Sequence, residues 1–426
     1  MLSRVVVIND ASIARGGATG LALLSIRKLR ERGIPVTFIV GDDGQNPELD
    51  DLGVEIVAIG GRALTKTSPL VASTRGIYNL EAANTIINWI AENDNNETIY
   101  HMHGWSKILS PSAFSALKRV AHRTVIHAHD FFLACPNGAF MDYKTSTPCD
   151  RKPLGMSCLA TNCDRRSYTQ KLWRVARQRM LLSTMKVSDV PWARYLLIHE
   201  AMAPLLERAS RDKSKITTVR NPARPFRESR THAEDNHNFF FVGRLEAEKG
   251  VEDALAAARL ADMPIEVIGD GPLRQTLEAR YPEAKFHGWK SRTEIGTLIA
   301  AARALLIPSR YPEPFGLVAA EAAGSGVPII ITESALLANE IVSRGIGTAC
   351  NTQNIRLFAD CLRTFDSQDN STIRRMSEKA FLPNNSLATT EDEWTTQLVE
   401  IYEHCLIPTQ YIQHSGKGPR SEDTAV

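Results

Sequence analysis

The 426-residue chain contains no long hydrophobic run. A transmembrane helix needs about 20 consecutive apolar residues, and no segment approaches that length. The N-terminus also lacks the apolar core of a secretory signal, because Met1 leads almost directly into the strand-like segment Arg4-Val-Val-Val-Ile-Asn9. We therefore expect a cytoplasmic protein, and we leave open a peripheral position at the inner face of the membrane.

A strong excess of one charge is also missing, since the formal net charge is only +2. No known nucleic-acid-binding motif occurs, so we do not expect nucleic acid as a partner. The hydrophobic content of 43% and the charged content of 23% are those of a globular protein. The length is sufficient for two domains of ordinary size.

Basic residues are nevertheless concentrated in one segment, residues 150–230, which holds 18 lysines and arginines against 7 acidic residues. On a predicted helix in this segment, cations flank apolar residues. The cations are Arg165, Arg166, Lys171, Arg174, Arg177 and Arg179, and the apolar residues are Leu172, Trp173, Val175, Met180 and Leu181. Such a helix could dock on anionic lipid headgroups. A solvated or internally neutralised helix face explains the same pattern, and we favour that interpretation.

Short apolar segments alternate with amphipathic ones, which predicts βα units and parallel sheets. The expected strands are Val5–Ile8, Val36–Val40, Val54–Ile59, Thr98–Met102, Thr124–Ala128, Phe239–Val242, Ile265–Ile268, Lys285–His287, Ala304–Ile307 and Pro328–Ile331. The expected helices are Gly20–Arg32, Thr74–Glu92, Pro111–Ala121, Val251–Leu260, Pro272–Arg280, Arg292–Ala302 and Ala319–Ala323. This pattern predicts an α/β protein with two doubly wound, Rossmann-like domains that face a central cleft, where ligands of such folds bind.

The polar segment Asn221–Asn238 is the best candidate for a linker. We accordingly place an N-terminal domain at residues 1–225, with a cysteine-containing insertion at 131–165, and a C-terminal domain at 226–390. A C-terminal helix is expected at 391–408, since Thr390-Glu-Asp-Glu393 forms a capping box. The polar tail 409–426 is expected to be disordered.

Two glutamates stand eight positions apart in the segment Glu313-Pro-Phe-Gly-Leu-Val-Ala-Ala-Glu321. The preceding strand and the following helix place Glu313 on a loop and Glu321 inside a helix. A helix start offers free N–H groups and a positive dipole end, which suit a phosphate. The two carboxylates could therefore hold hydroxyl groups at different ends of one elongated ligand. Taken alone, the pair could also be a cap and a solvated side chain.

Two further segments suit a nucleotide phosphate. Arg244 and Lys249 straddle a Gly turn after the strand at Phe239–Val242, where two cations could neutralise a diphosphate leaving group without a metal. A surface charge pair is the alternative interpretation. The turn Gly269-Asp-Gly271 lets the backbone approach a nucleotide, but it lacks the third glycine of a dinucleotide-binding fingerprint.

In combination, these motifs resemble the nucleotide-sugar half of the GT-B glycosyltransferases, and more narrowly the retaining family 4 of the group 1 enzymes with its E-x7-E motif. The motifs that carry the resemblance are Gly243-Arg-Leu with Glu248-Lys-Gly250, Gly269-Asp-Gly-Pro-Leu273, Phe286-His-Gly288, Pro308-Ser-Arg-Tyr-Pro-Glu-Pro-Phe-Gly-Leu317 and Glu321-Ala-Ala. The resemblance covers roughly the whole chain and is most specific over residues 239–331. Each motif alone is ambiguous, but five in this order are specific.

The resemblance implies a role for each matching residue. Arg244 and Lys249 would hold the donor pyrophosphate, Glu321 the ribose hydroxyls and Glu313 the hydroxyls of the donor sugar. Backbone N–H groups would complete these contacts, and they belong to Phe315, Gly316 and Leu317. The implied donor is a nucleotide diphosphate sugar, either a UDP- or a GDP-sugar, and no metal is required at the diphosphate. The chain also has no Asp-x-Asp motif in a suitable loop.

The N-terminal half would form the acceptor side. The Gly-rich loop at Gly16 and Gly17 matches the family's Gly-Gly loop, which lets an acceptor or donor phosphate approach the backbone; an ordinary tight turn is the alternative. His129, at the end of an expected strand, matches the histidine near the transferred sugar. We give it a positioning and polarising role, because the family evidence favours same-face attack assisted by the leaving phosphate. A structural histidine at a strand end remains the alternative.

Four of the seven cysteines, Cys135, Cys149, Cys158 and Cys163, lie in or next to the proposed insertion. A reducing cytoplasm disfavours disulfides, so four thiolates could hold a structural zinc that orders this loop. The spacing is not a standard zinc pattern, and free or buried thiols are the other interpretation.

The sequence thus predicts a retaining hexosyltransferase that moves a sugar from a nucleotide diphosphate sugar to a glycan or lipid-linked glycan, by analogy in bacterial polysaccharide synthesis of the exopolysaccharide or lipopolysaccharide type. Two alternatives remain. A nucleotide-sugar 2-epimerase shares the fold, and its product would form without acceptor. A non-catalytic sugar-nucleotide-binding protein would bind the donor without hydrolysing or transferring it.

Overall fold

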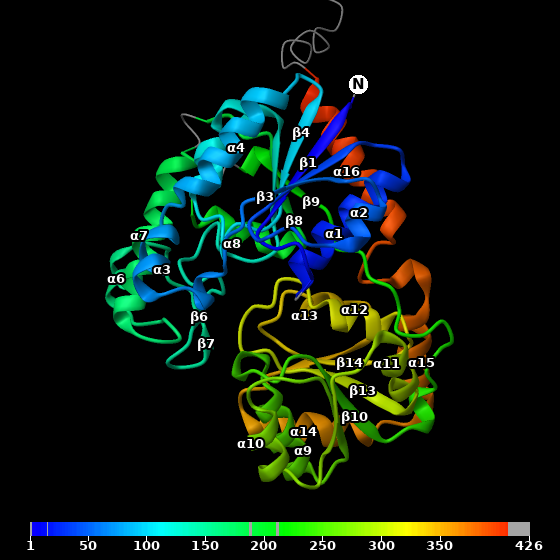
Figure 1. Ribbon diagram of the computed structural model, residues 1–426. Helices are drawn as coiled ribbons and strands as arrows, with labels where there is room; N and C mark the ends of the chain where they lie inside the picture. The colour runs from blue at the N-terminus through cyan, green and yellow to red at the C-terminus, as the bar shows by residue number, and fades with distance from the viewer. Residues whose placement is uncertain (1, 15, 187–189, 210–212, 408–426) are drawn as a thin grey trace, which may run out of the picture. The chain divides into compact units, whose positions relative to one another are not determined.

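The computed structural model describes residues 2–14, 16–186, 190–209 and 213–407. The predicted tail at 409–426 lies outside these residues. Two sheets with parallel strands form the framework, and helices lie against them (Figure 1). This arrangement confirms the predicted α/β class with two Rossmann-like, parallel-sheet domains.

The first sheet has seven strands in the order β3-β2-β1-β4-β5-β8-β9. Their bounds are β1 Arg4–Asn9, β2 Val36–Val40, β3 Glu55–Ala58, β4 Thr98–Met102, β5 Thr124–Ala128, β8 Arg194–Leu197 and β9 Ile216–Thr218. The central strand β1 pairs in parallel with β2 and β4, so that Val5 lies opposite both Val36 and Ile99. Strands β2, β4 and β5 are buried along their whole length, as expected for continuous apolar strands that are covered on both faces.

The helices of this half are α1 Gly17–Glu31, α2 Pro47–Asp51, α3 Pro69–Arg75, α4 Leu80–Asn93, α5 Ser112–Leu117, α6 Met156–Ala160, α7 Tyr168–Thr184 and α8 Ala203–Glu207. The single helix expected over Thr74–Glu92 is wrong. Helix α3 ends at Gly76, and Asn79 begins α4 by accepting a hydrogen bond from the N–H of Ala82 at 3.3 Å. The insertion is mostly irregular and contains one antiparallel pair, β6 Met141–Asp142 with β7 Thr147–Pro148.

The second sheet has six strands in the order β12-β11-β10-β13-β14-β15. Their bounds are β10 Asn238–Val242, β11 Ile265–Ile268, β12 Lys285–Gly288, β13 Ala302–Ile307, β14 Ile329–Thr332 and β15 Gly347–Cys350. The helices of this half are α9 Val251–Ala261, α10 Arg274–Arg280, α11 Arg292–Leu298, α12 Leu317–Ala323, α13 Ala338–Ser343, α14 Ile355–Asp366 and α15 Asn370–Phe381. The last helix, α16 Glu391–Leu406, belongs to unit 1 from Thr395 onward. Phe239 and Phe241 of β10 lie in a core that α9 and α14 close from one face (Figure 1).

The chain divides into two compact units, which are described separately. Unit 1 contains Met1–Ile126, Met185–Tyr195 and Thr395–Val426, and unit 2 contains His127–Thr184 and Leu196–Trp394. Among the helices that the structure describes, none has the length and apolar character needed to cross a membrane.

Candidate active site

Three loops of unit 2 leave the carboxyl ends of neighbouring parallel strands. Strand β10 pairs in parallel with both β11 and β13, so the loops after these strands begin at the same edge of the sheet. The loops are 243–250 after β10, 269–273 after β11 and 308–316 after β13. This edge is where ligands of open α/β sheets bind.

Glycine lets these loops approach each other closely. Gly250 has a φ of +69°, and a Cβ placed there would lie 1.9 Å from the carbonyl oxygen of Pro308. Gly269 has a φ of +140°, and its Cβ would lie 1.9 Å from the carbonyl oxygen of Gly243. A side chain at either position would clash with backbone and force an unfavourable conformation, so glycine is required at both Gly250 and Gly269.

Lys249 and Glu313 contact each other directly at this edge. The Nζ atom of Lys249 donates to Oε1 of Glu313 at 2.5 Å and to the hydroxyl oxygen of Tyr311 at 3.0 Å. The other carboxylate oxygen of Glu313 accepts a hydrogen bond from Ser309. The Lys249 and Glu313 side chains are only 20% and 14% exposed, so the ion pair is largely shielded from water.

The pair fixes the charge of both groups. Burial alone would lower the pKa of Lys249, but the Glu313 carboxylate and Tyr311 outweigh burial and raise it. Burial alone would raise the pKa of Glu313, but Lys249 and Ser309 outweigh it and lower that pKa. Burial, followed by the Glu313 charge, raises the pKa of Tyr311 to about 12. Near neutral pH the site therefore holds an ammonium, a carboxylate and a neutral phenol.

The start of α12 adds backbone donors. Gly316 has a φ of +74° and precedes the first helical residue, Leu317. Among the described residues, none accepts a hydrogen bond from the N–H groups of Phe315, Gly316 or Leu317. A Cβ on Gly316 would be 4.0 Å from the carboxyl carbon of Glu313, so these donors lie beside the Lys249–Glu313 pair. Together they suit a ligand that carries both anionic and hydroxyl groups.

Arg244 and Glu321 lie in different surroundings. Arg244 is 64% exposed and donates to Glu246 at 2.9 Å, so its guanidinium can reach a ligand. Glu321 of α12 is 17% exposed and accepts from Arg292 of α11 at 2.6 Å. Burial raises the pKa of Glu321, and Arg292 opposes this shift. The carboxylate that the resemblance assigns to ribose thus already has a cationic partner.

Arg310 is a positioning residue that the sequence analysis missed. Its guanidinium holds the carboxylate of Asp253 in α9 with two hydrogen bonds of 2.6 Å. Its backbone N–H donates to the carbonyl oxygen of Glu248 at 2.9 Å. Arg310 therefore ties the loop of Glu313 to the loop of Lys249. Arg310 lies inside the sequence motif Pro308 to Leu317, but its partner Asp253 is distant in sequence, so the motif alone does not reveal this contact.

The remaining predicted residues belong to other elements of the chain. Gly16 and Gly17 begin α1 in unit 1, and a Cβ on Gly16 would meet no atom within 4 Å. His129 follows β5 in unit 2 and stacks on His127 with ring centroids 4.3 Å apart. Burial lowers the pKa of His129 to about 3, so this imidazole is neutral near neutral pH.

The four cysteines of the insertion gather around a buried lysine. Cys135, Cys158 and Cys163 are buried and Cys149 is half-buried, and all are free thiols. Lys171 is fully buried and donates to the sulfur atoms of Cys163 at 3.0 Å and Cys158 at 3.4 Å. Among the described residues, these sulfurs are not part of any group of three or more potential ligands whose atoms all lie within 4.8 Å of one another. A zinc bound to all four would need a tighter set, so this arrangement does not fit the predicted zinc site.

Most of the basic residues around α7 have partners within the protein. Lys171 and Arg177 are buried, while Arg174 and Arg165 form ion pairs with Asp164 at 2.6 Å and Glu248 at 3.0 Å. The internally neutralised helix face that we favoured accounts for these contacts.

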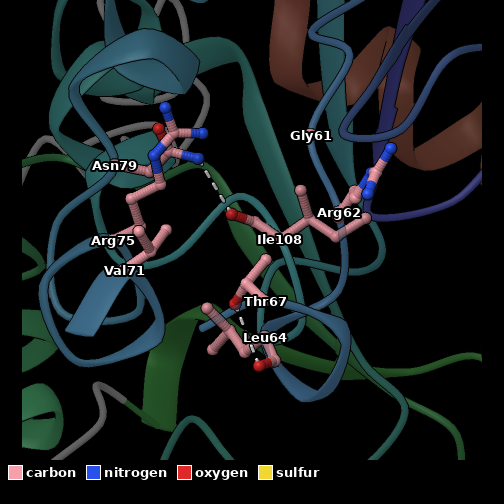
Figure 2. Close-up of a pocket in the computed structure, with 8 residues that line it drawn as sticks. All are labelled: Gly61, Arg62, Leu64, Thr67, Val71, Arg75, Asn79 and Ile108. Atoms are coloured by element: carbon pink, nitrogen blue, oxygen red, sulfur yellow. Dashed lines mark hydrogen bonds between the residues drawn. The ribbon is translucent and has the colours of Figure 1, made fainter. Parts of the chain in front are cut away.

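A small pocket in unit 1 does not coincide with any predicted site residue (Figure 2). Its lining is Gly61, Arg62, Leu64, Thr67, Val71, Arg75, Asn79 and Ile108. Inside it, Asn79 donates to the carbonyl oxygen of Ile108 at 3.0 Å, and Thr67 donates to that of Leu64 at 3.1 Å. These polar groups are already satisfied locally, so the pocket is a weaker candidate than the sheet edge.

Comparison with known proteins shows what this half of the chain resembles. Residues 223–405 match the model of glycosyl transferases group 1. The chain is 28% identical over 263 residues to a glycogen synthase of Mycobacterium tuberculosis, covering 56% of this chain and 59% of the synthase. It is 33% identical over 145 residues to a GDP-mannose-dependent alpha-(1-6)-phosphatidylinositol dimannoside mannosyltransferase of the same species, covering 32% of this chain and 37% of that protein.

Solved structures match almost the whole chain. Anabaena HepE in complex with UDP superposes with a TM-score of 0.64 at 16% identity, covering 94% of this chain and 100% of that one. WaaG, a glycosyltransferase involved in lipopolysaccharide biosynthesis, superposes with a TM-score of 0.62 at 15% identity, covering 93% and 99%. These neighbours confirm the predicted GT-B fold.

Proposed function

We infer that this chain is a group 1 glycosyltransferase, the family whose model residues 223–405 match, and that it transfers a sugar from a nucleotide diphosphate sugar to a glycan or lipid-linked glycan. The main support for this proposal is the contact between Lys249 and Glu313. It places a cation and a carboxylate beside free backbone N–H groups, at the edge of the second sheet where ligands of open α/β sheets bind. The alignment spans only 59% of the length of the glycogen synthases, and what those proteins act on is not assumed for this chain.

Lys249 and Arg244 would bind the diphosphate of the donor. Lys249 is buried and held in place by two hydrogen bonds, whereas Arg244 is exposed and free to close on the ligand. Charge-assisted hydrogen bonds from two cations would stabilise the negative charge that develops on the leaving diphosphate. No step of this scheme requires a metal at the diphosphate.

Glu313 and Glu321 would hold hydroxyl groups at the two ends of the donor. Glu313 accepts from Lys249 and Ser309 and keeps a negative charge, so it suits the hydroxyls of the sugar. Glu321, further along α12, suits the ribose hydroxyls once Arg292 shares its carboxylate. The N–H groups of Phe315, Gly316 and Leu317 would complete the contacts.

We propose retention of configuration through attack on the face from which the leaving group departs. The acceptor hydroxyl oxygen bonds to the anomeric carbon as the bond from that carbon to the diphosphate breaks. The acceptor proton passes to a phosphate oxygen of the leaving group. His129 is neutral, so it would orient and polarise the sugar through a hydrogen bond rather than donate a charge.

The donor nucleotide and the biological setting are finer proposals. HepE was solved with UDP and with UDP-glucose, and the mycobacterial mannosyltransferase is named for GDP-mannose, so both nucleotide classes belong in a screen. Bacterial polysaccharide synthesis is supported by the likeness to WaaG, and only by analogy. A peripheral position at the inner face of the membrane stays a prediction.

A nucleotide-sugar screen tests this proposal. Thermal stability and nucleotide release would be measured with UDP-, GDP-, ADP- and TDP-sugars on the wild type and on Lys249→Ala and Glu313→Ala. Arg363→Ala is the matched control, because Arg363 makes an exposed ion pair with Asp360 on α14. We expect one donor to stabilise and be slowly hydrolysed by wild type and control, and neither effect in the two site variants.

Other outcomes would replace the proposal. An epimerised nucleotide sugar formed without acceptor would identify a 2-epimerase. Binding without hydrolysis or transfer would identify a non-catalytic sugar-nucleotide-binding protein. If none of the donors binds, the assignment of this sheet edge is wrong.

A further inference from the structure

The Lys171 ammonium, on α7 just after the cysteine-containing insertion, is an unusual buried charge. Its residue is 0% exposed, and its Nζ atom contacts the sulfur atoms of Cys163 and Cys158 at 3.0 and 3.4 Å. Among the described residues, no carboxylate lies within 4.0 Å of this nitrogen. The nearest acidic neighbour in sequence to Cys163 is Asp164, which is occupied by Arg174 at 2.6 Å.

A buried ammonium needs a negative partner, and here the candidates are sulfur atoms. Cys163 is the better partner, because its sulfur is closer to Nζ and also lies 3.7 Å from the amide nitrogen of Asn137. Burial raises the pKa of Cys163, and the Lys171 ammonium that donates to its sulfur opposes this shift. Lys171 is thus the group that stabilises the thiolate form of this buried cysteine. A thiolate is the form of cysteine that reacts with oxidants.

We propose that Cys163 and Lys171 form an oxidation-sensitive site that closes to a covalent sulfur–nitrogen bond. The oxidant class is a hydroperoxide, with hydrogen peroxide as the simplest member. The site joins the end of the insertion to the start of α7 and is independent of the transfer reaction proposed above. Nothing in the roles assigned to Lys249, Glu313 or His129 uses it.

The reaction proceeds in two balanced steps. The Cys163 thiolate takes one oxygen from hydrogen peroxide as the O–O bond breaks, giving a sulfenic acid and a hydroxide, and the hydroxide takes a proton from the Lys171 ammonium to form water. The neutral Nζ then attacks the sulfur, the S–O bond breaks, and the departing hydroxide takes a second amine proton as water. The sulfur is oxidised by two electrons, and the peroxide is reduced to two waters.

Geometry favours Lys171 over Cys158 as the group that closes the bond. Nζ already touches the Cys163 sulfur, whereas among the described residues the two sulfurs share no hydrogen bond and both cysteines are free. The product would join the loop before α7 to the first turn of that helix and so brace an insertion with little regular structure.

Mass spectrometry of the full chain after peroxide treatment tests the proposal. We expect a loss of two hydrogen atoms, roughly 2 Da, and a peptide containing Cys163 joined to the one containing Lys171. Trypsin should no longer cleave after Lys171, and a thiol reductant should restore the original mass. Cys158→Ser should keep the cross-link, and Cys163→Ser should lose it.

Two lysine variants keep the test decisive. Lys171→Arg retains the positive charge but offers a poor nucleophile, so a sulfenic-acid probe should label Cys163 and no cross-link should form. Lys171→Met should also lose the cross-link, and circular dichroism would verify that each variant is folded. The proposal is overturned if both lysine variants still lose two hydrogens and Cys158→Ser does not, because the product is then a Cys158–Cys163 disulfide. It is equally overturned if the native mass contains one zinc ion per chain that protects the thiols until a chelator removes it.

Discussion

The Nζ atom of Lys249 lies 2.5 Å from Oε1 of Glu313, although the two residues are 64 positions apart in the sequence. Each comes from a loop that follows a strand of the second sheet, and Arg310 ties these loops together through the carbonyl oxygen of Glu248. The motif that contains Lys249 and the motif that contains Glu313 thus form one site in the fold. If both groups bind the donor as proposed, the donor competes with this contact.

The first prediction concerns the energy of this pair. Lys249→Met should destabilise the protein by about 3 kcal/mol, because it leaves a largely buried carboxylate without its cation. Glu313→Gln should also be destabilising, because it leaves the largely buried ammonium of Lys249 without its carboxylate. The double variant should be more stable than the sum of the single changes predicts, giving a coupling energy of about 1–3 kcal/mol by denaturant unfolding. Additive effects within about 0.5 kcal/mol would show that the two side chains do not interact in solution.

A second prediction separates two glycines that both belong to assigned loops. Gly250→Ala should lower the melting temperature clearly, because its φ is +69° and its Cβ would lie 1.9 Å from the carbonyl oxygen of Pro308. Gly16→Ala should leave the melting temperature nearly unchanged, because its φ is 175° and no atom lies within 4 Å. If Gly16 faces a ligand, its variant should instead raise KM for donor or acceptor. Equal thermal shifts in the two variants would contradict this assignment.

The alternation of apolar segments was enough to predict most strands of both sheets. Strands such as Val36–Val40 and Ile265–Ile268 are short and mostly apolar, and the structure has them with the same bounds. Strands β8, β9 and β15 were missed. Ile216-Thr-Thr218 and Gly347-Thr-Ala-Cys350 are half-buried and carry few apolar side chains, so their strand conformation depends on neighbours that sequence periodicity does not reveal.

The site shows the same division between local and tertiary information. The residue types at Arg244, Lys249, Glu313 and Glu321 were visible as motifs. The hydrogen-bond partners of these carboxylates were not visible. Ser309 and Arg292 carry no sequence signal of their own, and only the fold shows that they donate to Glu313 and Glu321. Roles in catalysis remain predictions, whereas the contacts themselves are observed.

A third prediction uses the ion pair between Arg292 and Glu321. Burial raises the pKa of Glu321, and Arg292 opposes that shift, so Arg292→Ala should raise the pKa further. If the carboxylate accepts hydrogen bonds from ribose, donor affinity must fall as pH decreases through this pKa. The acidic limb of the affinity profile should therefore move to higher pH in the variant, as measured by calorimetry across pH 5 to 8. An unshifted limb would mean that Glu321 does not control donor binding.

The last prediction concerns acid stability of unit 2. Glu234 is 1% exposed and accepts from Arg230 at 2.8 Å and Arg374 at 3.1 Å. Burial alone would raise its pKa, but the two guanidinium groups outweigh burial and hold it at about 2. Because the folded pKa is depressed, this stabilisation is complete above the unfolded value of about 4.3 and is lost as pH falls toward about 2.

Glu234→Gln should therefore lower the melting temperature at pH 7 and flatten its decline between about pH 4.3 and 2. Glu48→Gln, at an exposed ion pair with Arg27, is the control and should follow the wild-type curve. Parallel curves for Glu234→Gln and the wild type would show that this carboxylate is not a source of the acid sensitivity.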